Sequence, residues 1–376
     1  MYQFINNVRL NAILLSVSIL SLLICGIGYC SELIIHQLES PAIVKNMMGI
    51  SSLRQVEVYI PDGYNDSNLR YPVLYWIPGF EDPAYGIGYK ASLDNAIKTG
   101  KIPPAIIVFI DVQDGTWFLN SPVFGNWEDF LVSELIPFID NTYRTIPDKM
   151  HRGLMGISSG GYSALVLSIR HPDTWGAIGA NDPAVYSMWL MLRDEADFPQ
   201  AYKPYYNLVR LIIQNLPPNF DGYANLDWRA KAVIQLATAF SPNPNKPLFC
   251  DFPFSSDGKW IPEVREIHSK YDLTNPKTIA DNYEILQNLL SIVIVVPEVV
   301  NPEENNRILN IELIEILNKQ GIEVTRIDSP GGHISLLVER FMSITEELLK
   351  SIMLNETSVS LTNKKISLWG QIKEMQ

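Results

Sequence analysis

The sequence predicts an α/β fold in which a doubly wound, mainly parallel sheet carries an inserted, partly helical cap region. Continuous apolar runs at 73–77 and 105–112 are typical of strands that are covered on both faces. Apolar residues at helical spacing follow at 127–139, so strands and helices alternate along the chain. A glycine-serine turn then joins a strand at 153–157 to a helix at 160–170, which is the order of a parallel sheet with helical connections.

The first thirty residues are predicted to be separate from the folded domain. A single basic residue, Arg9, precedes an apolar run at 12–27, and the small residues Gly26 and Gly28 lie at the end of that run. This order is typical of a signal peptide, and the length of the run also fits a retained N-terminal anchor. Both alternatives predict a secreted, periplasmic or otherwise extracytoplasmic protein, attached to a membrane only through the segment 1–30.

The remaining elements are predicted to form one domain at 31–354. A segment at 186–246, rich in Tyr, Trp and Pro, departs from the alternating pattern and is expected to be a partly helical cap. A polar tail at 355–376 is expected to be loosely attached. Further strands are predicted at 55–60, 175–180, 292–296 and 322–327, and a last helix at 334–353.

Composition and charge exclude several classes of protein. Hydrophobic residues make up 47% of the chain, enough for a large core, and the formal net charge is −12. A chain this acidic repels phosphate backbones, so nucleic acid is not an expected partner. The three cysteines, Cys25, Cys30 and Cys250, predict neither a disulfide framework nor a zinc site, and no metal or cofactor is expected.

The candidate nucleophile lies in the sequence Gly156-Ile157-Ser158-Ser159-Gly160. The pattern G-x-S-x-G places a serine on a tight turn between a strand and a helix. Its glycines relieve crowding around a strained residue, and the helix that follows directs free N–H groups toward the serine. We therefore expect Ser158 to be the nucleophile, whereas Ser159 is better placed as a backbone donor.

The candidate base is His333. It follows the last predicted strand through the sequence Ser-Pro-Gly-Gly and precedes the last predicted helix. In a doubly wound sheet this loop opens on the same carboxyl edge as Ser158. A neutral imidazole there can take the serine proton and return it to the leaving group. The other four histidines lie in positions that are typical of surface residues.

The third member of a catalytic triad is expected after the strand at 292–296, which gives the chain order serine, acid, histidine. That loop holds no aspartate. Glu298 lies just past the strand and is the preferred acid, with Glu303 and Glu304 as alternatives that also suit the first turn of the next helix. Asn301 is a further, uncharged alternative.

Two backbone donors are expected to form an oxyanion hole. One is the N–H of Ser159, the residue after the nucleophile. The other is the N–H of Phe80, which a turn at Gly79 exposes after the strand at 73–77.

Taken together, several segments resemble the esterase D-type family of α/β-hydrolases, which includes S-formylglutathione hydrolases, feruloyl and enterochelin esterases, and mycolyltransferases. The resemblance spans about 55–349 and depends on VEVYIPDGY, YPVLYWIPGF, NSPVFGNWEDFLVSELIPFIDNTYRT, RGLMGISSGGYSALVLSIRHPDTWGAIGA and SPGGH. It implies the α/β-hydrolase fold, with Ser158 as nucleophile and His333 as base. It also implies an oxyanion hole around Gly79 and Phe80.

The sequence departs from the family pattern at two places. Pro78 stands where the family usually has histidine, which backbone donors should tolerate. Glu298 and Asn301 occupy the loop where the family acid is usually an aspartate, and this departure bears on whether the chain is fully active.

These observations predict a serine esterase that cleaves a small-molecule or carbohydrate-linked carboxylic ester without metal or cofactor. An acyltransferase of the mycolyltransferase type is one alternative. A catalytically silent binding protein on the same scaffold is another, motivated by the missing aspartate. Aromatic residues of the predicted cap are expected to pack or to stack on a sugar or phenolic acid: Trp189, Tyr202, Tyr205, Tyr206 and Trp228.

Overall fold

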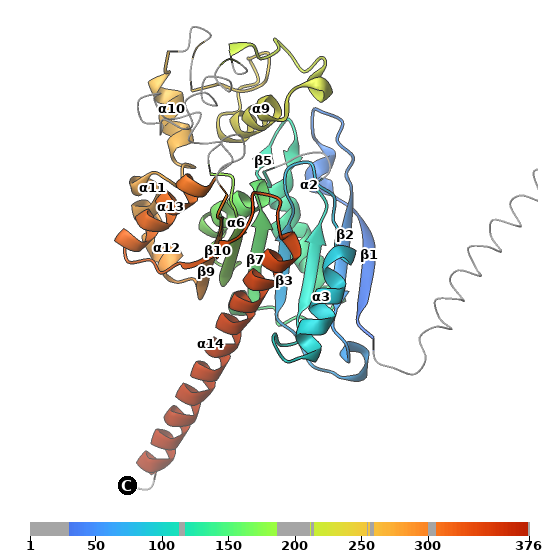
Figure 1. The fold of residues 1–376 in the computed structure, drawn as a ribbon, viewed down its shortest axis with the longest axis vertical. Helices are drawn as coiled ribbons and strands as arrows, with labels where there is room; N and C mark the ends of the chain where they lie inside the picture. The colour runs from blue at the N-terminus through green and yellow to red at the C-terminus, as the bar shows by residue number, and fades with distance from the viewer. Residues whose placement is uncertain are drawn as a thin grey trace, which may run out of the picture.

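The fold is built on one sheet of eight strands, in the order β1-β2-β4-β3-β7-β8-β9-β10. The computed structural model describes residues 30–112, 117–185, 211, 214–253, 255, 259–299 and 306–374, and from 356 onward only their backbone. All neighbouring strands from β4 to β10 are parallel, whereas β2 is antiparallel to both β1 and β4. This is the predicted mainly parallel, doubly wound sheet (Figure 1).

Each element has defined bounds. The strands of the sheet are β1 (Glu32–Glu39), β2 (Leu53–Ile60), β3 (Val73–Ile77), β4 (Ile106–Ile110), β7 (Arg152–Ile157), β8 (Ala177–Asn181), β9 (Ser291–Pro297) and β10 (Thr325–Ser329), and β5 (Asn120–Ser121) pairs with β6 (Gly125–Asn126). The helices are α2 (Pro41–Val44), α3 (Ile87–Lys98), α4 (Trp127–Asp129), the π-helical turn η2 (Phe130–Leu135), α5 (Ile136–Thr142), α6 (Ser159–Arg170), α9 (Trp228–Phe240), α10 (Pro262–Ser269), α11 (Pro276–Asp281), α12 (Tyr283–Gln287), α13 (Arg307–Lys319) and α14 (Leu337–Glu374).

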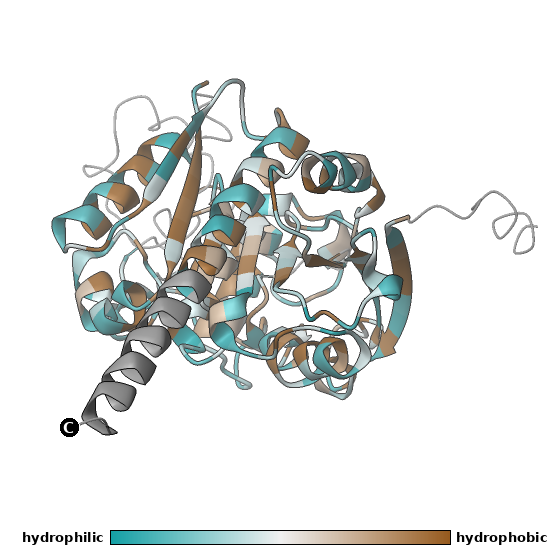
Figure 2. Cartoon of the chain, turned by 90° about the horizontal axis from the view of Figure 1, so that it is seen from below, coloured by the Kyte–Doolittle hydropathy of each residue, from teal (hydrophilic) through white to brown (hydrophobic). Residues whose placement is uncertain are grey.

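Helices cover both faces of the sheet, because successive side chains of each strand point to opposite faces. In β3, Tyr75 packs into the core layer that contains α6 and α13, whereas Leu74 and Trp76 pack into the layer that contains α3 and α14. The strands are apolar on both faces, and Figure 2 shows them in brown between helices that turn hydrophilic residues outward.

Several predicted bounds differ from the structure. The strand predicted at 322–327 begins later, because Ile322 donates its N–H to Leu317 O and so closes α13. The helix predicted at 334–353 begins at Leu337 and continues to Glu374, since no proline interrupts 354–374. The predicted polar tail is therefore a continuation of α14. Strand β1 and helix α3 were not predicted.

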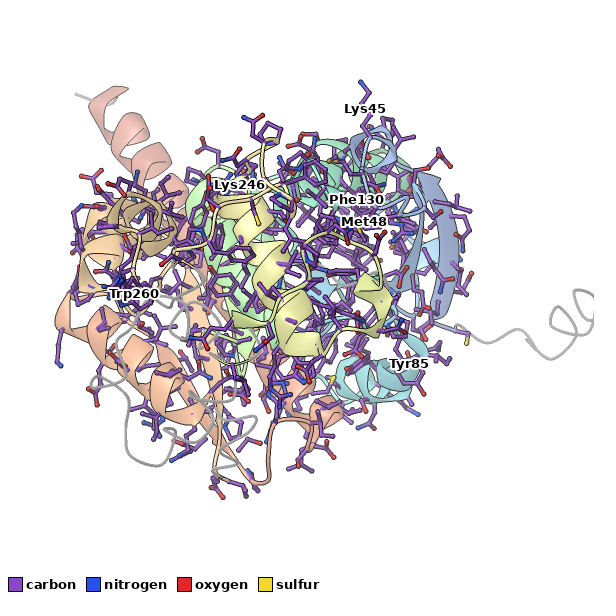
Figure 3. The ribbon with its side chains drawn as sticks, turned by 90° about the horizontal axis from the view of Figure 1, so that it is seen from above. Lys45, Met48, Tyr85, Phe130, Lys246 and Trp260 are labelled. Carbon is purple, nitrogen blue, oxygen red and sulfur yellow. The ribbon has the colours of Figure 1, made fainter. Side chains whose placement is uncertain are left out.

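Helix α9 lies over the carboxyl edge of the sheet, where the predicted site is located (Figures 1 and 3). Lys231 of α9 pairs at 2.9 Å with Glu81, which follows β3. The described end of the predicted cap segment therefore contacts this edge, while 186–210 and 212–213 lie outside the described residues.

None of the helices in the described part of the chain combines the length and apolar character that crossing a bilayer requires.

A buried histidine links the stability of this region to pH. The side chain of His268 in α10 has no exposed surface, its Nε2 lies 2.7 Å from Ser241 Oγ, and burial lowers its pKa from 6.5 to about 4. Between these values the unfolded chain binds a proton that the folded chain does not, so stability falls as the pH falls from 6.5 to 4. The expected loss is about 3 kcal/mol in the free energy of unfolding.

Urea unfolding at several pH values tests this prediction. In His268→Gln, which keeps an amide for Ser241 but cannot titrate, the pH dependence between 6.5 and 4 should become shallower. An equally steep dependence in the variant would show that another group is responsible.

Candidate active site

The predicted nucleophile lies on a sharp turn between β7 and α6. Ser158 has φ 56° and ψ −118°, a left-handed conformation that is rare for any residue with a side chain. Its N–H donates to Asn181 O at 3.0 Å, and its carbonyl oxygen accepts from Ala184 N and Tyr162 N. These bonds to β8, to the chain after it and to α6 hold the strained residue in place.

The glycines around Ser158 are required by close backbone contacts. A Cβ on Gly160 would lie 2.2 Å from Ile77 O and 2.4 Å from Pro78 O. A Cβ on Gly156 would lie 2.6 Å from Ile77 O. The end of β3 therefore packs directly against the turn, as the G-x-S-x-G pattern led us to expect.

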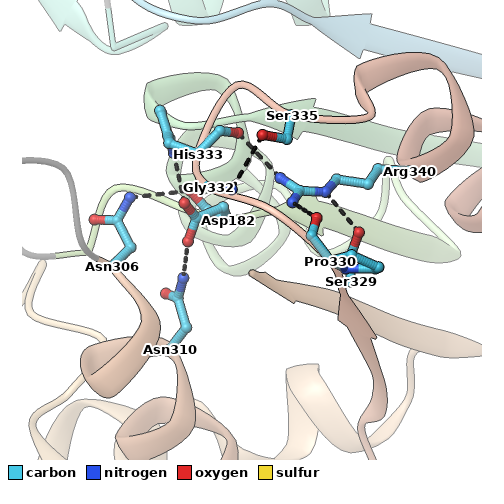
Figure 4. A network of polar contacts seen from close by, with 9 residues as sticks. All are labelled: Asp182, Asn306, Asn310, Ser329, Pro330, Gly332, His333, Ser335 and Arg340. Carbon is cyan, nitrogen blue, oxygen red and sulfur yellow. Dashed lines mark hydrogen bonds and ion pairs between the residues drawn. The ribbon is translucent and has the colours of Figure 1, made fainter. Parts of the chain in front are cut away.

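The predicted base lies in the loop between β10 and α14. His333 is held there by Arg340, whose guanidinium is buried and donates to three acceptors of the loop (Figure 4). Nε donates to Ser329 Oγ at 2.8 Å, Nη2 to Pro330 O at 2.8 Å and Nη1 to His333 O at 3.1 Å. Burial lowers the pKa of Arg340, and the charge of Asp182 partly opposes that shift.

The carboxylate that contacts His333 is Asp182, immediately after β8. Asp182 Oδ2 lies 2.5 Å from His333 Nδ1, and the Asp182 side chain is almost fully buried. Asn310 of α13 donates to the other carboxylate oxygen at 2.7 Å, and Asn306 donates to the Asp182 carbonyl oxygen at 3.2 Å. Asp182 itself has φ 42°, so these bonds fix a residue in a strained conformation (Figure 4).

The expectation that Glu298 orients the histidine is therefore wrong. The Glu298 side chain is exposed, and the residue supports the loop through its backbone N–H, which donates to Ser329 O at 2.8 Å. The alternatives Asn301, Glu303 and Glu304 lie outside the described residues.

The physical reason is that β8 and β9 are parallel neighbours, so their carboxyl ends lie side by side at one edge. An acid after either strand can reach the same histidine. Asp182 N donates to Val295 O at 3.0 Å, which brings the end of β8 against β9. A signal was present in the sequence, because Asp182-Pro183 directly follows β8, a buried strand next to the strand that precedes Ser158.

The loop after β3 carries the predicted oxyanion donors. Gly79 and Phe80 line the same cavity as Ser158, and a Cβ on Gly79 would lie 3.9 Å from the Ser158 Cβ. The loop is closed by a bond from Asp82 N to Gly79 O at 3.1 Å. Ser159, the other predicted donor, begins α6 and is buried. The two residues predicted as donors therefore lie next to Ser158, one following it in the chain and one in the adjacent loop.

A cavity of about 500 Å³ opens in front of these residues, and both Ser158 and His333 line it. The two predicted residues therefore line one cavity at the carboxyl edge of the sheet. Aromatic side chains form much of its wall, and two at the mouth are exposed: Tyr85, 61% exposed before α3 (Figure 3), and Trp228, 36% exposed at the start of α9. The described residues contain no cluster of three or more metal-ligating side chains. Of the predicted cap aromatics, Trp189, Tyr202, Tyr205 and Tyr206 lie outside the described residues.

Comparisons with known proteins show which proteins the chain is similar to. Residues 49–218 match the family described as "Putative esterase". An endo-1,4-beta-xylanase/feruloyl esterase of Xylanibacter ruminicola is 31% identical over 164 residues, which are 40% of this chain and 22% of that protein. Esterase Rv1288 of Mycobacterium tuberculosis is 32% identical over 120 residues, 31% of this chain and 26% of that protein. The chain thus spans about a quarter of the length of these curated relatives.

Solved structures share the fold at low sequence identity. A ferulic acid esterase superposes with a TM-score of 0.56 at 17% identity, over 86% of this chain and 100% of that chain. An S-formylglutathione hydrolase from Staphylococcus aureus superposes with a TM-score of 0.52 at 11% identity, over 86% and 99% of the two chains. The protein therefore has the α/β-hydrolase fold, and its residues 49–218 carry the sequence pattern of the esterase family.

Proposed function

We propose that the chain is a serine hydrolase that cleaves carboxylic esters through an acyl-enzyme on Ser158. One observation carries the proposal: Ser158 and His333 line one cavity, while His333 Nδ1 lies 2.5 Å from a buried carboxylate of Asp182. This is the arrangement in which an imidazole activates a serine hydroxyl. The family match and the relatives named as esterases support the same chemistry.

The reaction follows from the positions of these three side chains. Ser158 Oγ adds to the ester carbonyl carbon as its proton passes to His333 Nε2. The C–O bond to the alcohol then breaks, and the alcohol leaves with that proton. A water molecule, deprotonated by the same imidazole, hydrolyses the acyl-enzyme. Throughout, Asp182 accepts the Nδ1–H and stabilises the positive charge of the imidazolium.

The negative charge that forms on the carbonyl oxygen requires donors already in place. The N–H groups of Phe80 and Ser159 serve this purpose. Pro78 replaces the histidine of the family pattern without loss, because the donors belong to the backbone.

Substrates of this site are phenolic or carbohydrate-linked esters. Exposed aromatic and aliphatic side chains surround the cavity mouth, and Ile334 beside the histidine is 73% exposed. Flat faces of this kind stack on aromatic rings and on the apolar faces of sugars. The relative from Xylanibacter ruminicola bears feruloyl esterase in its name, which agrees with this class.

Two alternative functions, a silent binding protein and an acyltransferase, can be distinguished from an ester hydrolase. The hypothesis of a silent binding protein depended on a missing acid, and Asp182 supplies that carboxylate. Acyl transfer, as in mycolyltransferases, uses the same acyl-enzyme and differs in the acceptor. Adding a sugar or alcohol acceptor to the assay distinguishes the two, because transfer yields a new ester in place of the free acid.

We further propose that the protein acts outside the cytoplasm, on the basis of the apolar run at 12–27.

Labelling with a fluorophosphonate tests the proposal directly, since this probe reacts only with an activated nucleophile. We expect the folded full-length protein to be labelled at Ser158 and Ser158→Ala to remain unlabelled, as measured by mass spectrometry of the labelled peptide. Ser159→Ala is the matched control, because it removes a neighbouring hydroxyl but keeps the backbone N–H. Labelling that persists in Ser158→Ala, or that fails in the folded wild-type protein, would refute the assignment.

A further inference from the structure

The charges around the cavity are unbalanced. Among the described residues that line it, the side chains with a formal charge are the carboxylates Glu81 and Asp82, and His333 is the one titratable base. No lysine or arginine belongs to the described lining.

The two carboxylates differ in their surroundings. Glu81 is paired with Lys231 of α9 at 2.9 Å, so its charge is largely compensated. Within the described part of the chain, no lysine or arginine forms an ion pair with Asp82. Asp82 is an exposed residue, and the desolvation that its carboxylate does experience raises its pKa, while the Gly79 backbone and the charge of His333 oppose that shift. Among the described residues that line the cavity, Asp82 is therefore the carboxylate without a lysine or arginine partner.

Asp82 lies close to the reacting atoms. A methyl group placed on Gly79 would lie 2.7 Å from Asp82 Oδ2 and 3.9 Å from Ser158 Cβ. The carboxylate and the nucleophile thus flank the same glycine. A charge held at this position acts on any group that a substrate carries next to its ester carbonyl.

We propose that Asp82 is a specificity-determining residue that restricts the cavity to esters uncharged near the carbonyl and excludes those that carry an anionic group there. The inference rests on the proposed function and narrows its substrate class to neutral esters. Two like charges a few ångströms apart repel even where solvent reaches one of them, and at the effective dielectric constant of a protein surface the penalty should be about tenfold or more in kcat/KM. This is discrimination by repulsion, in which the unwanted substrate is disfavoured by an opposing charge.

The test uses two 4-nitrophenyl esters that differ only in charge, one with a terminal carboxylate on a short acyl chain and one with the corresponding carboxamide. The wild-type protein should prefer the neutral ester by about tenfold or more in kcat/KM. Asp82→Asn, which keeps the shape and the backbone bonds of the loop, should reduce that preference about tenfold. Because the preference is a ratio within one protein, differences in folded fraction or in oxyanion stabilisation cancel.

Asp173→Asn is the matched control, since Asp173 loses the same charge at a 98% exposed position between α6 and β8. Its preference should equal that of the wild-type protein. A preference in Asp82→Asn that stays within twofold of the wild type would overturn the inference while leaving ester hydrolysis established.

Binding measurements separate this result from a failure of the proposed function. The corresponding 4-nitroanilides, which an esterase cleaves poorly, are titrated calorimetrically into Ser158→Ala with and without Asp82→Asn. Weaker binding of the anionic anilide, relieved by the second substitution, supports the role of Asp82 even if no ester is hydrolysed. Equal binding of both anilides to both variants counts against it.

Discussion

Replacing Asp182 with asparagine is expected to lower kcat for an activated ester by about 10³- to 10⁴-fold. The Asp182 carboxylate accepts the Nδ1–H of His333 and is buried, so it fixes the tautomer that leaves Nε2 free to take the serine proton. An asparagine can keep the contact only with a neutral amide, which favours the wrong tautomer and leaves the imidazolium uncompensated. Steady-state kinetics with a 4-nitrophenyl ester measure the loss.

The matched control is Glu298→Gln. Glu298 was the acid expected from the sequence, but its side chain is exposed and its contribution to the histidine loop comes from the backbone N–H. This variant should keep kcat within about twofold of the wild-type value, since surface substitutions rarely disturb a structure. The opposite pattern, with Glu298→Gln inactive and Asp182→Asn active, would show that another arrangement of the loops operates in solution.

The positions of the proposed nucleophile and the proposed base could be predicted because each position is encoded locally. Backbone atoms at the end of β3 leave no room for a Cβ at Gly156 or Gly160. Both glycines are close to Ser158 in sequence, so this steric constraint is visible as a short motif. His333 stands between the last strand and the last helix, and in a parallel sheet that position alone determines the edge to which it belongs.

The proposed acid, Asp182, could not be predicted in the same way, because its position depends on which strands are neighbours. The carboxyl end of β8 and that of β9 are adjacent in space but more than a hundred residues apart in sequence, and both offered a carboxylate. Only the pairing of the strands, and the amide of Asn310 directed at Asp182, distinguishes them. The ion pair between Lys231 and Glu81 likewise depends on how α9 lies over the sheet.

The start of the long C-terminal helix α14 also could not be predicted to the residue, because it depends on contacts in the folded structure. Its apolar residues predicted a helix from about 334, yet the turn that contains Gly332 and Ser335 delays its start to Leu337. Arg340, one turn into α14, looks like an ordinary helical surface residue in the sequence. In the structure it is 2% exposed, because the helix start brings its guanidinium under the histidine loop.

Replacing Arg340 with methionine is expected to lower kcat about 100-fold with little change in KM, and to lower the free energy of unfolding by about 3 to 5 kcal/mol. Methionine fills a similar volume but offers no donor to Ser329 Oγ, Pro330 O or His333 O, all of which the guanidinium satisfies. Buried acceptors that lose their donor draw the loop toward solvent, and a displacement of about 1 Å of the imidazole suffices for such a loss of turnover. Urea unfolding and steady-state kinetics on the same preparations measure both effects.

The expected loss of kcat with little change in KM is what distinguishes a positioning residue from a residue that only supports the fold. Substrate contacts come from the cavity walls, so binding should survive while proton transfer fails. Arg340→Lys keeps the charge and some of the donors and should recover part of kcat. Arg326→Met is the matched control, because it removes a surface ion pair with Asp328 of the same strand, β10. It should change kcat little and the free energy of unfolding by under about 1 kcal/mol. Arg340→Met could instead lose stability but keep kcat in its folded fraction. The loop between β10 and α14 would then hold its geometry without the guanidinium, and the contact between Asp182 and His333 alone would account for the alignment of the imidazole.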